Sequence, residues 1–182
     1  DIIMIKYISG NEQAGLYNVG FILLTAVYLF PSTLYQKYLL PKFHRWANHD
    51  REKFYRVYKK GNFLMAVLGT AITLLIWSLS WFFIPFMFGE DYSESIKIVN
   101  ILACTLPFYL VAFSVASTLV TQEHMKRKVI YMGIVAIVNL LLNVCLIPMY
   151  QASGAAIATV ISNVLLLSIY FYANKKYVFT NI

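Results

Sequence analysis

Two asparagines lie four residues apart in a long stretch that carries no charged side chain. Asn139 and Asn143 both fall within residues 129–173, where no Asp, Glu, Lys or Arg occurs. A spacing of four places both amides on one face of a helix. An amide in an apolar environment needs a hydrogen-bond partner, so this face must meet another helix or a wet cavity. Two roles therefore stay open: hydrogen bonding between helices, or lining a substrate pathway.

A carboxylate and two prolines extend this set of candidate residues. Asp1 opens the apolar segment Asp1–Ser9, and carboxylates inside membrane helices usually line pathways. Pro31 and Pro107 lie near the middle of two other apolar stretches, where a missing backbone donor kinks a helix and frees a carbonyl group. We therefore name Asp1, Asn139 and Asn143 as candidate pathway residues, and Pro31 and Pro107 as candidate kinks.

Residue types that catalysis or metal binding would need are sparse. The three histidines, His44, His49 and His124, fall in basic connectors, and neither His-x-x-x-His nor Cys-x-x-Cys occurs. Cys104 and Cys145 lie within apolar runs, which is typical of small buried side chains. There is no serine elbow and no phosphate-binding glycine loop. We expect no catalytic residue, no metal site, no cofactor and no enzyme activity.

The composition indicates the elements that must hold these residues. Of the 182 residues, 60% are hydrophobic and 13% are charged, and the mean hydropathy is +0.65. A soluble domain is about 25% charged, and a run of about 20 apolar residues crosses a bilayer as a helix. No run alternates with period two, as a barrel strand would. The sequence predicts an all-α integral membrane protein, a polytopic helix bundle; despite a net charge of +7, we expect no nucleic-acid partner.

Hydropathy and helix breakers predict about six membrane-spanning helices in a single domain, residues 1–182. Pro148 and Gly154 mark a turn, because residues 129–173 are too long for one tilted helix. The chain opens on Asp rather than Met, so we expect the first helix to be truncated and residue 1 to fall inside a longer gene product. The predicted spans are residues 1–9 (partial), 16–40, 62–88, 96–120, 129–149 and 154–173, with a basic linker at 41–61.

Basic residues predict the orientation in the membrane. Of the 15 Lys and Arg residues, all but Lys6 and Lys97 fall in connectors that lie on one side of the predicted helices. Cytoplasmic connectors carry the excess of Lys and Arg in membrane proteins. We therefore expect the linker 41–61 and the C-terminus to be cytoplasmic. The linker also interleaves aromatic and basic residues, so part of it is a candidate interfacial helix attracted to anionic membrane lipids.

Several short motifs resemble bacterial polysaccharide exporters. The matching motifs, in chain order, are Asp1-Ile-Ile, Ala14-Gly15-Leu16-Tyr17, Phe88-Gly89-Glu90-Asp91-Tyr92, Asn139-x-x-x-Asn143, Ile147-Pro148, Gly154-Ala155-Ala156-Ile157-Ala158-Thr159 and Ser162. In this order and spacing, the chain resembles the C-terminal half of O-antigen flippases of the multidrug/oligosaccharidyl-lipid/polysaccharide exporter superfamily.

The resemblance implies a fold and a function. It implies one lobe of a two-lobe, twelve-helix transporter, with the N-terminal lobe of the same chain as its partner. It also implies that a lipid-linked oligosaccharide crosses the bacterial inner membrane by alternating access, in the service of lipopolysaccharide or related polysaccharide biosynthesis. The polysaccharide polymerase machinery is a further implied partner, and Asp1, Asn139 and Asn143 become cavity residues.

Two other functions remain as alternatives. A drug/cation antiporter of the same fold would need an acidic site in the membrane, and Asp1 is the one carboxylate that falls in a predicted span. An integral-membrane polysaccharide polymerase or glycosyltransferase would need acid and base residues in a sizeable loop outside the membrane. The connectors on the less basic side are only a few residues long, which disfavours such an enzyme.

Overall fold

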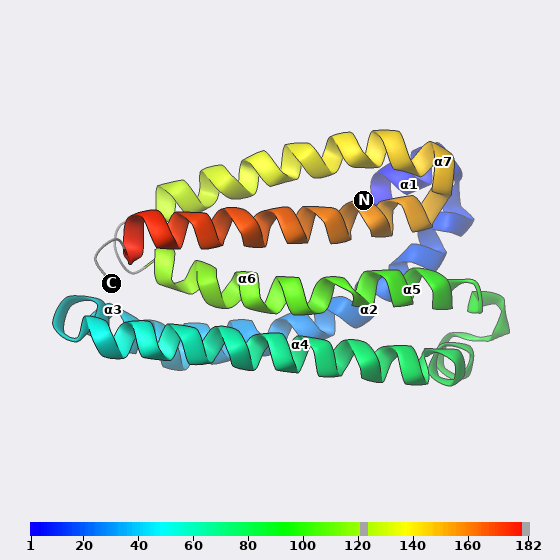
Figure 1. Ribbon diagram of the computed structural model, residues 1–182. Helices are drawn as coiled ribbons and strands as arrows, with labels where there is room; N and C mark the ends of the chain where they lie inside the picture. Colours follow the sequence, from blue (N-terminus) through cyan, green and yellow to red (C-terminus); the bar gives the residue numbers. More distant parts are fainter. Residues whose placement is uncertain (121–123, 180–182) are drawn as a thin grey trace.

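The computed structural model describes residues 1–120 and 124–179, and the elements among them are helical (Figure 1). The all-α class predicted from the composition is therefore confirmed. The helices, in chain order, are α1 (Ile2–Ser9), α2 (Asn11–Leu34), the π-helical η1 (Tyr35–Leu39), α3 (Leu40–His49), α4 (Arg51–Phe88), the 3₁₀ turn η2 (Glu90–Tyr92), α5 (Ser95–Ala103), α6 (Thr105–Leu119), α7 (Met125–Ala173) and the π-helical η3 (Asn174–Val178).

Four helical stretches among the described residues are long and apolar enough to cross a membrane. Their outer faces carry large apolar side chains: Phe63 is 73% exposed, Trp81 67% and Phe86 77%. Water-soluble proteins rarely show such a surface, whereas lipid tails accept it. The protein is therefore a multi-pass membrane protein. The four stretches are Asn11–His49, Arg51–Phe88, Ser95–Leu119 and Met125–Val178.

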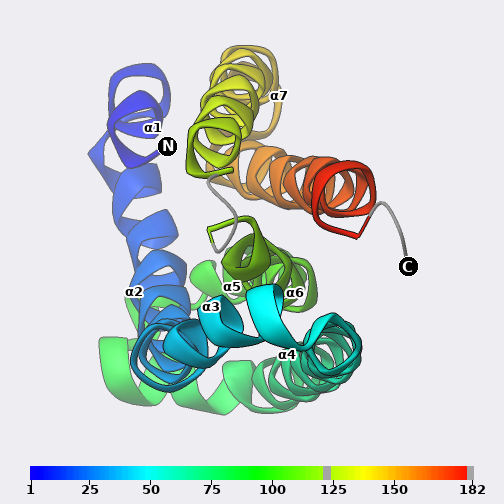
Figure 2. The same cartoon turned by 90° about the vertical axis from the view of Figure 1, so that its left-hand side faces the viewer.

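The helices run between two chemically different ends. Figure 1 shows α3, the start of α4 and both ends of α7 at one end, and α1, η2 and the middle of α7 at the other. We call them the basic end and the acidic end, because the first holds most of the Lys and Arg residues and the second holds Glu12, Glu90, Asp91 and Glu94. In the end-on view of Figure 2, α6 lies at the centre of the bundle, between α4 and α7.

A sharp turn divides α7 into two antiparallel arms. Gln151 has φ 51° and ψ −134°, which no helical residue adopts, and it lies between Pro148 and Gly154. Close packing fixes the turn, because a Cβ atom at Gly154 would lie 2.2 Å from the carbonyl oxygen of Leu146. The two arms therefore lie side by side (Figures 1 and 2).

The contact between α4 and α6 is made backbone against backbone. A Cβ atom at Gly69 would lie 2.6 Å from the Cα of Pro107. Pro107 lies in the first turn of α6, just after the break at Cys104 that separates α5 from α6. Because proline has no N–H, it leaves the carbonyl of Ala103 without its helical donor. The buried Thr73 hydroxyl donates to that carbonyl at 2.8 Å, so the freed group is bonded inside the bundle instead of facing a cavity.

The other candidate kink, Pro31, lies inside α2, four residues before η1 begins.

The basic linker predicted at residues 41–61 is helical in the structure. It contains α3, and α4 begins within it, at Arg51, whereas the membrane span is predicted to begin at Asn62. Asp50 explains the earlier start, because its side chain caps the helix by accepting a hydrogen bond from the Lys53 N–H at 2.9 Å. Helix α3 buries Phe43 and Ala47 and exposes its basic side chains, as an interfacial helix does.

Candidate functional site

The Asp1 carboxylate accepts hydrogen bonds from three side chains on three different segments. Its Oδ1 accepts from Asn143 Nδ2 at 2.7 Å. Its Oδ2 accepts from the Tyr17 hydroxyl at 2.9 Å and from the Thr159 hydroxyl at 2.9 Å. Asp1 stands at the N-cap position of α1 but does not cap it, because its side chain is used in these contacts instead. The carboxylate thus joins α1 to α2 and to both arms of α7.

The hydrogen bonds continue along α7 through the two asparagines. Asn143 Nδ2 also donates to Asn139 Oδ1 at 3.0 Å, and Asn139 Nδ2 donates to the Ser162 hydroxyl at 3.1 Å. The spacing of four puts both amides on one face of the first arm, and the turn at Gln151 brings the second arm against that face. The three candidate pathway residues are therefore brought together in one site. We call Asp1, Tyr17, Asn139, Asn143, Thr159 and Ser162 the Asp1 cluster.

Three members of the Asp1 cluster were not among the predicted site residues. Tyr17 is 2% exposed, and a tyrosine in an apolar run is indistinguishable from ordinary core packing in the sequence. Thr159 and Ser162 are three residues apart, so they share a face of the second arm. This spacing was the one sequence feature that could have identified Thr159 and Ser162 as site residues. It is a weak indication, because hydroxyl side chains in membrane helices often bond only to their own backbone. Thr159 does both, since its hydroxyl also lies 3.0 Å from the Ala155 carbonyl oxygen.

A cavity opens beside the Asp1 cluster, between the two arms of α7. Its volume is about 290 Å³. Asp1, Asn139, Thr159 and Ser162 contribute polar groups to one part of its wall, and Asn163 adds a further amide. The rest of the lining is apolar and consists of Met132, Val135, Ala136 and Leu166. Asn139 therefore lies both in a contact between helices and in the cavity wall, whereas Asn143 is fully buried and is not part of the lining.

The oxygen atoms of the Asp1 cluster suit a hard cation. Asn143 is fully buried, and its Oδ1 accepts no hydrogen bond from the residues that the structure describes. A buried amide oxygen without a donor is costly unless water or a cation satisfies it. The neighbouring ligand atoms are carboxylate, amide and hydroxyl oxygens, which hard cations prefer. No group of three or more His, Cys, Asp or Glu residues that could hold a metal ion occurs in the described part of the chain.

Other polar contacts hold the helices together outside this site. The Tyr35 hydroxyl donates to Ser114 Oγ at 2.7 Å, and Ser114 donates to Asn62 Oδ1 at 2.7 Å. These bonds tie α4 and η1 to α6 within the core at the basic end. The histidines do not form a site: His44 and His49 are exposed on α3, and the His124 ring lies 5.8 Å from that of Tyr177.

An all-α membrane bundle with a hydrogen-bonded carboxylate at an open cavity between its helices is typical of a membrane transporter. The comparison with protein families makes this specific. The lipid II flippase MurJ family matches residues 1–182, the whole chain, and the chain therefore belongs to that family. Flippases of this family are transporters and not enzymes, so the polymerase or glycosyltransferase alternative is set aside. The expected resemblance to flippases is confirmed at the level of the family.

A curated relative points in the same direction. The capsular polysaccharide biosynthesis protein CapF of Staphylococcus aureus is 24% identical to the chain over 175 residues. The match covers 96% of this chain and 44% of CapF, so the chain spans less than half the length of that relative. No solved structure matches the chain.

Proposed function

We propose that this chain is the C-terminal lobe of a two-lobe, twelve-helix flippase of the bacterial inner membrane. The protein would carry a lipid-linked oligosaccharide from the cytoplasmic to the outer leaflet by alternating access between the lobes. The family match over residues 1–182 is the observation that carries the proposal. We propose the repeat unit of O-antigen or of a related polysaccharide as the substrate, and the lipid II of the family's name is the competing substrate.

The Asp1 cluster supports translocation on physical grounds. A glycan head group cannot cross hydrocarbon without losing its hydration, so a protein must offer it polar groups along the way. The cavity between the arms of α7 offers a carboxylate, amides and hydroxyls inside an otherwise apolar bundle. Such polar residues within membrane helices usually mark a transport path.

The arrangement of helices supports a six-helix lobe. α2 with η1, α4, α5 with α6, and the two arms of α7 would make five passes if each crosses the membrane once, and we count α1, which at eight residues is too short to span alone, as part of a sixth. Arg45, Arg51, Lys126 and Lys175 lie at the basic end, so we propose that this end and the C-terminus are cytoplasmic. The N-terminal lobe, membrane lipids and the polysaccharide polymerase machinery are the proposed partners.

A leaflet assay tests the proposed function. The gene encoding this chain is deleted, and lipid-linked repeat units and lipid II are each quantified in the two leaflets of spheroplast membranes. We expect the substrate to be retained in the cytoplasmic leaflet, and the precursor that is retained identifies it. A normal distribution of both precursors after deletion would contradict the proposal. Accumulation of single, unpolymerised units in the outer leaflet would also contradict it, because that result indicates a polymerase.

Coupling to a cation is a second candidate role for the Asp1 cluster, and the unpartnered Asn143 Oδ1 favours it. The cluster has one formal negative charge, so a monovalent hard cation such as Na⁺ would neutralise it. Asp1, Asn139, Asn143 and Thr159 are the residues that would contribute oxygen ligands. A cation bound there would strengthen the contacts among α1 and the two arms of α7, and its release would weaken them. This is also the site that the drug/cation antiporter alternative requires.

A further inference from the structure

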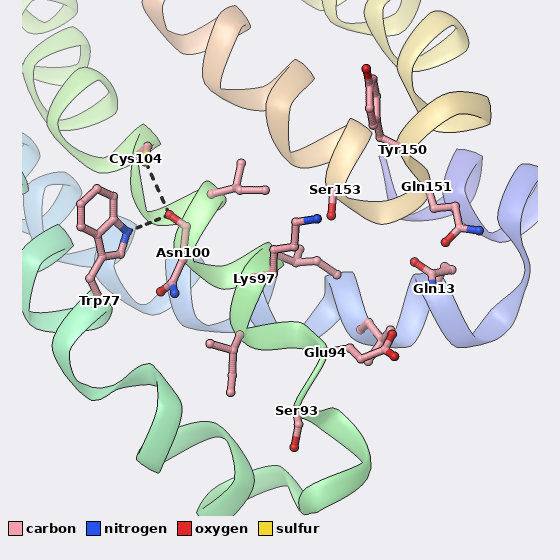
Figure 3. Close-up of a pocket in the computed structure, with 14 residues that line it drawn as sticks. Gln13, Trp77, Ser93, Glu94, Lys97, Asn100, Cys104, Tyr150, Gln151 and Ser153 are labelled. Atoms are coloured by element: carbon pink, nitrogen blue, oxygen red, sulfur yellow. Dashed lines mark hydrogen bonds between the residues drawn. The ribbon is translucent and has the colours of Figure 1, made fainter.

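A second, open cavity, lined by both polar and apolar side chains, lies at the acidic end, and it shares no lining residue with the cavity beside the Asp1 cluster (Figure 3). Its volume is about 890 Å³, within the range of about 300–1,000 Å³ typical of small-molecule sites. The wall is built from the start of α2, from α4 and α5, and from the turn of α7. Its polar lining residues are Gln13, Trp77, Ser93, Glu94, Lys97, Asn100, Tyr150, Gln151 and Ser153.

Lys97 gives this cavity a free positive charge. The Lys97 side chain points into the space between α5 and the turn that carries Ser153 (Figure 3). Lys97 is exposed, and no ion pair to its ammonium group occurs among the described residues. Its surroundings at this end are acidic, with Glu94 on the same cavity wall. An ammonium group without a protein partner on a cavity wall is suited to a carboxylate or phosphate oxygen of a ligand.

Gln151 holds a strained backbone at the edge of the same cavity. With φ 51° and ψ −134°, it is the one non-glycine residue with positive φ in the described part of the chain. Glycine adopts this conformation without strain, whereas other residues pay about 1–3 kcal/mol. Such strain is kept where the side chain of the residue has a role. Figure 3 shows the Gln151 amide directed toward that of Gln13. Both amides line the cavity, from opposite sides of the α2–α7 contact.

The wall also carries polar and aromatic groups of the kinds that recognise sugars. The Ser153 hydroxyl and the Asn100 amide, whose Oδ1 also accepts from Ser80 at 3.1 Å, match the donors and acceptors of a polyhydroxylated ring, whereas the Tyr150 hydroxyl points away from Lys97 (Figure 3). The Trp77 indole supplies an aromatic surface for C–H groups, and it is held in place by a hydrogen bond from its Nε1 to the Asn100 carbonyl oxygen at 2.9 Å. We propose that this cavity binds a saccharide that bears a carboxylate, the sugar contacting the amides and Trp77 and the carboxylate contacting Lys97.

This assignment deepens the proposed function and rests on it for the source of the ligand. If the basic end is cytoplasmic, the cavity opens at the outer surface. It then lies where the glycan of a translocated lipid emerges. Binding of that glycan would favour its release from the cavity beside the Asp1 cluster and slow its return.

A ligand-binding experiment tests the assignment without measuring transport. The complete protein, purified in detergent, is mixed with glucuronic acid, and ligand contact is followed by saturation-transfer NMR, with glucose and acetate as separate probes. We expect clear transfer to glucuronic acid and weak transfer to glucose or acetate. In Lys97→Gln the dissociation constant for glucuronic acid should rise by roughly tenfold, because a charge-assisted hydrogen bond is lost. Lys6→Gln is the matched control, since Lys6 is exposed but does not line the cavity.

A second variant distinguishes loss of ligand binding from loss of folding. Gln151→Gly removes the amide but relieves the positive φ, so this variant should fold at least as well as the wild type. We expect it to bind glucuronic acid less tightly and to unfold at the same or a higher temperature. Absence of transfer in the wild type, equal transfer to glucose, or unchanged binding in Lys97→Gln or Gln151→Gly would overturn the assignment.

The binding result and the leaflet assay have separate outcomes. Failure of Lys97→Gln to change binding, together with retained precursor after gene deletion, would overturn only the saccharide site. Lys97-dependent binding with a normal leaflet distribution would overturn only the proposed translocation.

Discussion

Asp1 and Asn143 are 142 positions apart in the sequence, yet the asparagine amide donates to the carboxylate at 2.7 Å. This bond connects Asp1 to the half of the first arm of α7 that lies nearer the turn. Removal of Asn143 leaves Asp1 Oδ1 without this donor, whereas after removal of Asp1 the Asn143 amide still donates to Asn139 Oδ1. The pair is therefore a direct point at which to test the candidate pathway.

Replacement of both asparagines by leucine should impair transport more than folding. In the complete protein, Asn139→Leu combined with Asn143→Leu removes two amides and leaves one oxygen of the exposed Asp1 carboxylate to be satisfied by water. We expect a large loss of precursor export in the leaflet assay with a smaller loss of protein in the membrane. Asn18→Leu, at an exposed position of α2, is the control and should export normally. Full export by the double variant would show that the amides are not pathway groups.

Sodium should stabilise the protein through the Asp1 carboxylate. At a sodium concentration of ten times its dissociation constant, binding to the folded state adds about 1.4 kcal/mol. We expect the temperature of unfolding in detergent to rise in sodium chloride relative to choline chloride, and the rise to vanish in Asp1→Asn. An equal rise in Asp1→Asn, or no rise in the wild type, would contradict cation binding at this cluster.

Two glycines of α7 should respond in opposite ways to alanine. Gly154→Ala would place a methyl group 2.2 Å from the Leu146 carbonyl oxygen, so we expect a loss of about 1–3 kcal/mol or more. Gly133 has no atom within 4 Å of an added Cβ, and Gly133→Ala should stabilise its helix by about 0.5–1 kcal/mol. Thermal unfolding at one scan rate checks both, and a destabilised Gly133→Ala would contradict the packing described for the first arm.

Single cysteines should reveal which end of the bundle is cytoplasmic. Cys104 and Cys145 are first replaced by alanine, and a cysteine is then placed at Asp91 or at His49, which are both exposed. A membrane-impermeant maleimide should label Asp91→Cys in intact spheroplasts and His49→Cys only after permeabilisation. The reverse pattern would place the C-terminus outside the cell.

The helices follow from the sequence because apolar length and helix breakers are local properties. The uncharged stretch 129–173 and its two breakers predict a turn, and the structure places the turn at Gln151. The start of α4 at Arg51 was missed because hydropathy reports where a helix enters the apolar layer, whereas the Asp50 cap decides where it begins.

The sequence predicted three of the six residues of the Asp1 cluster. Asn139 and Asn143 stood out because amides are costly in hydrocarbon, and Asp1 stood out because it is charged. Tyr17 and Thr159 join them only after the chain folds, since their hydroxyls reach Asp1 across helix contacts that no spacing along the chain encodes. The unpartnered Asn143 oxygen is likewise a property of the packing.

The close approach of Gly69 to Pro107 has a mechanical consequence. With no side chain between the two backbones, α4 and α6 cannot slide past each other without collision, so they should move as one rigid unit. The Asp1 cluster, by contrast, is held by polar contacts that can exchange. Any rocking of the helices must therefore occur at the Asp1 cluster, while α4 and α6 keep their relative position.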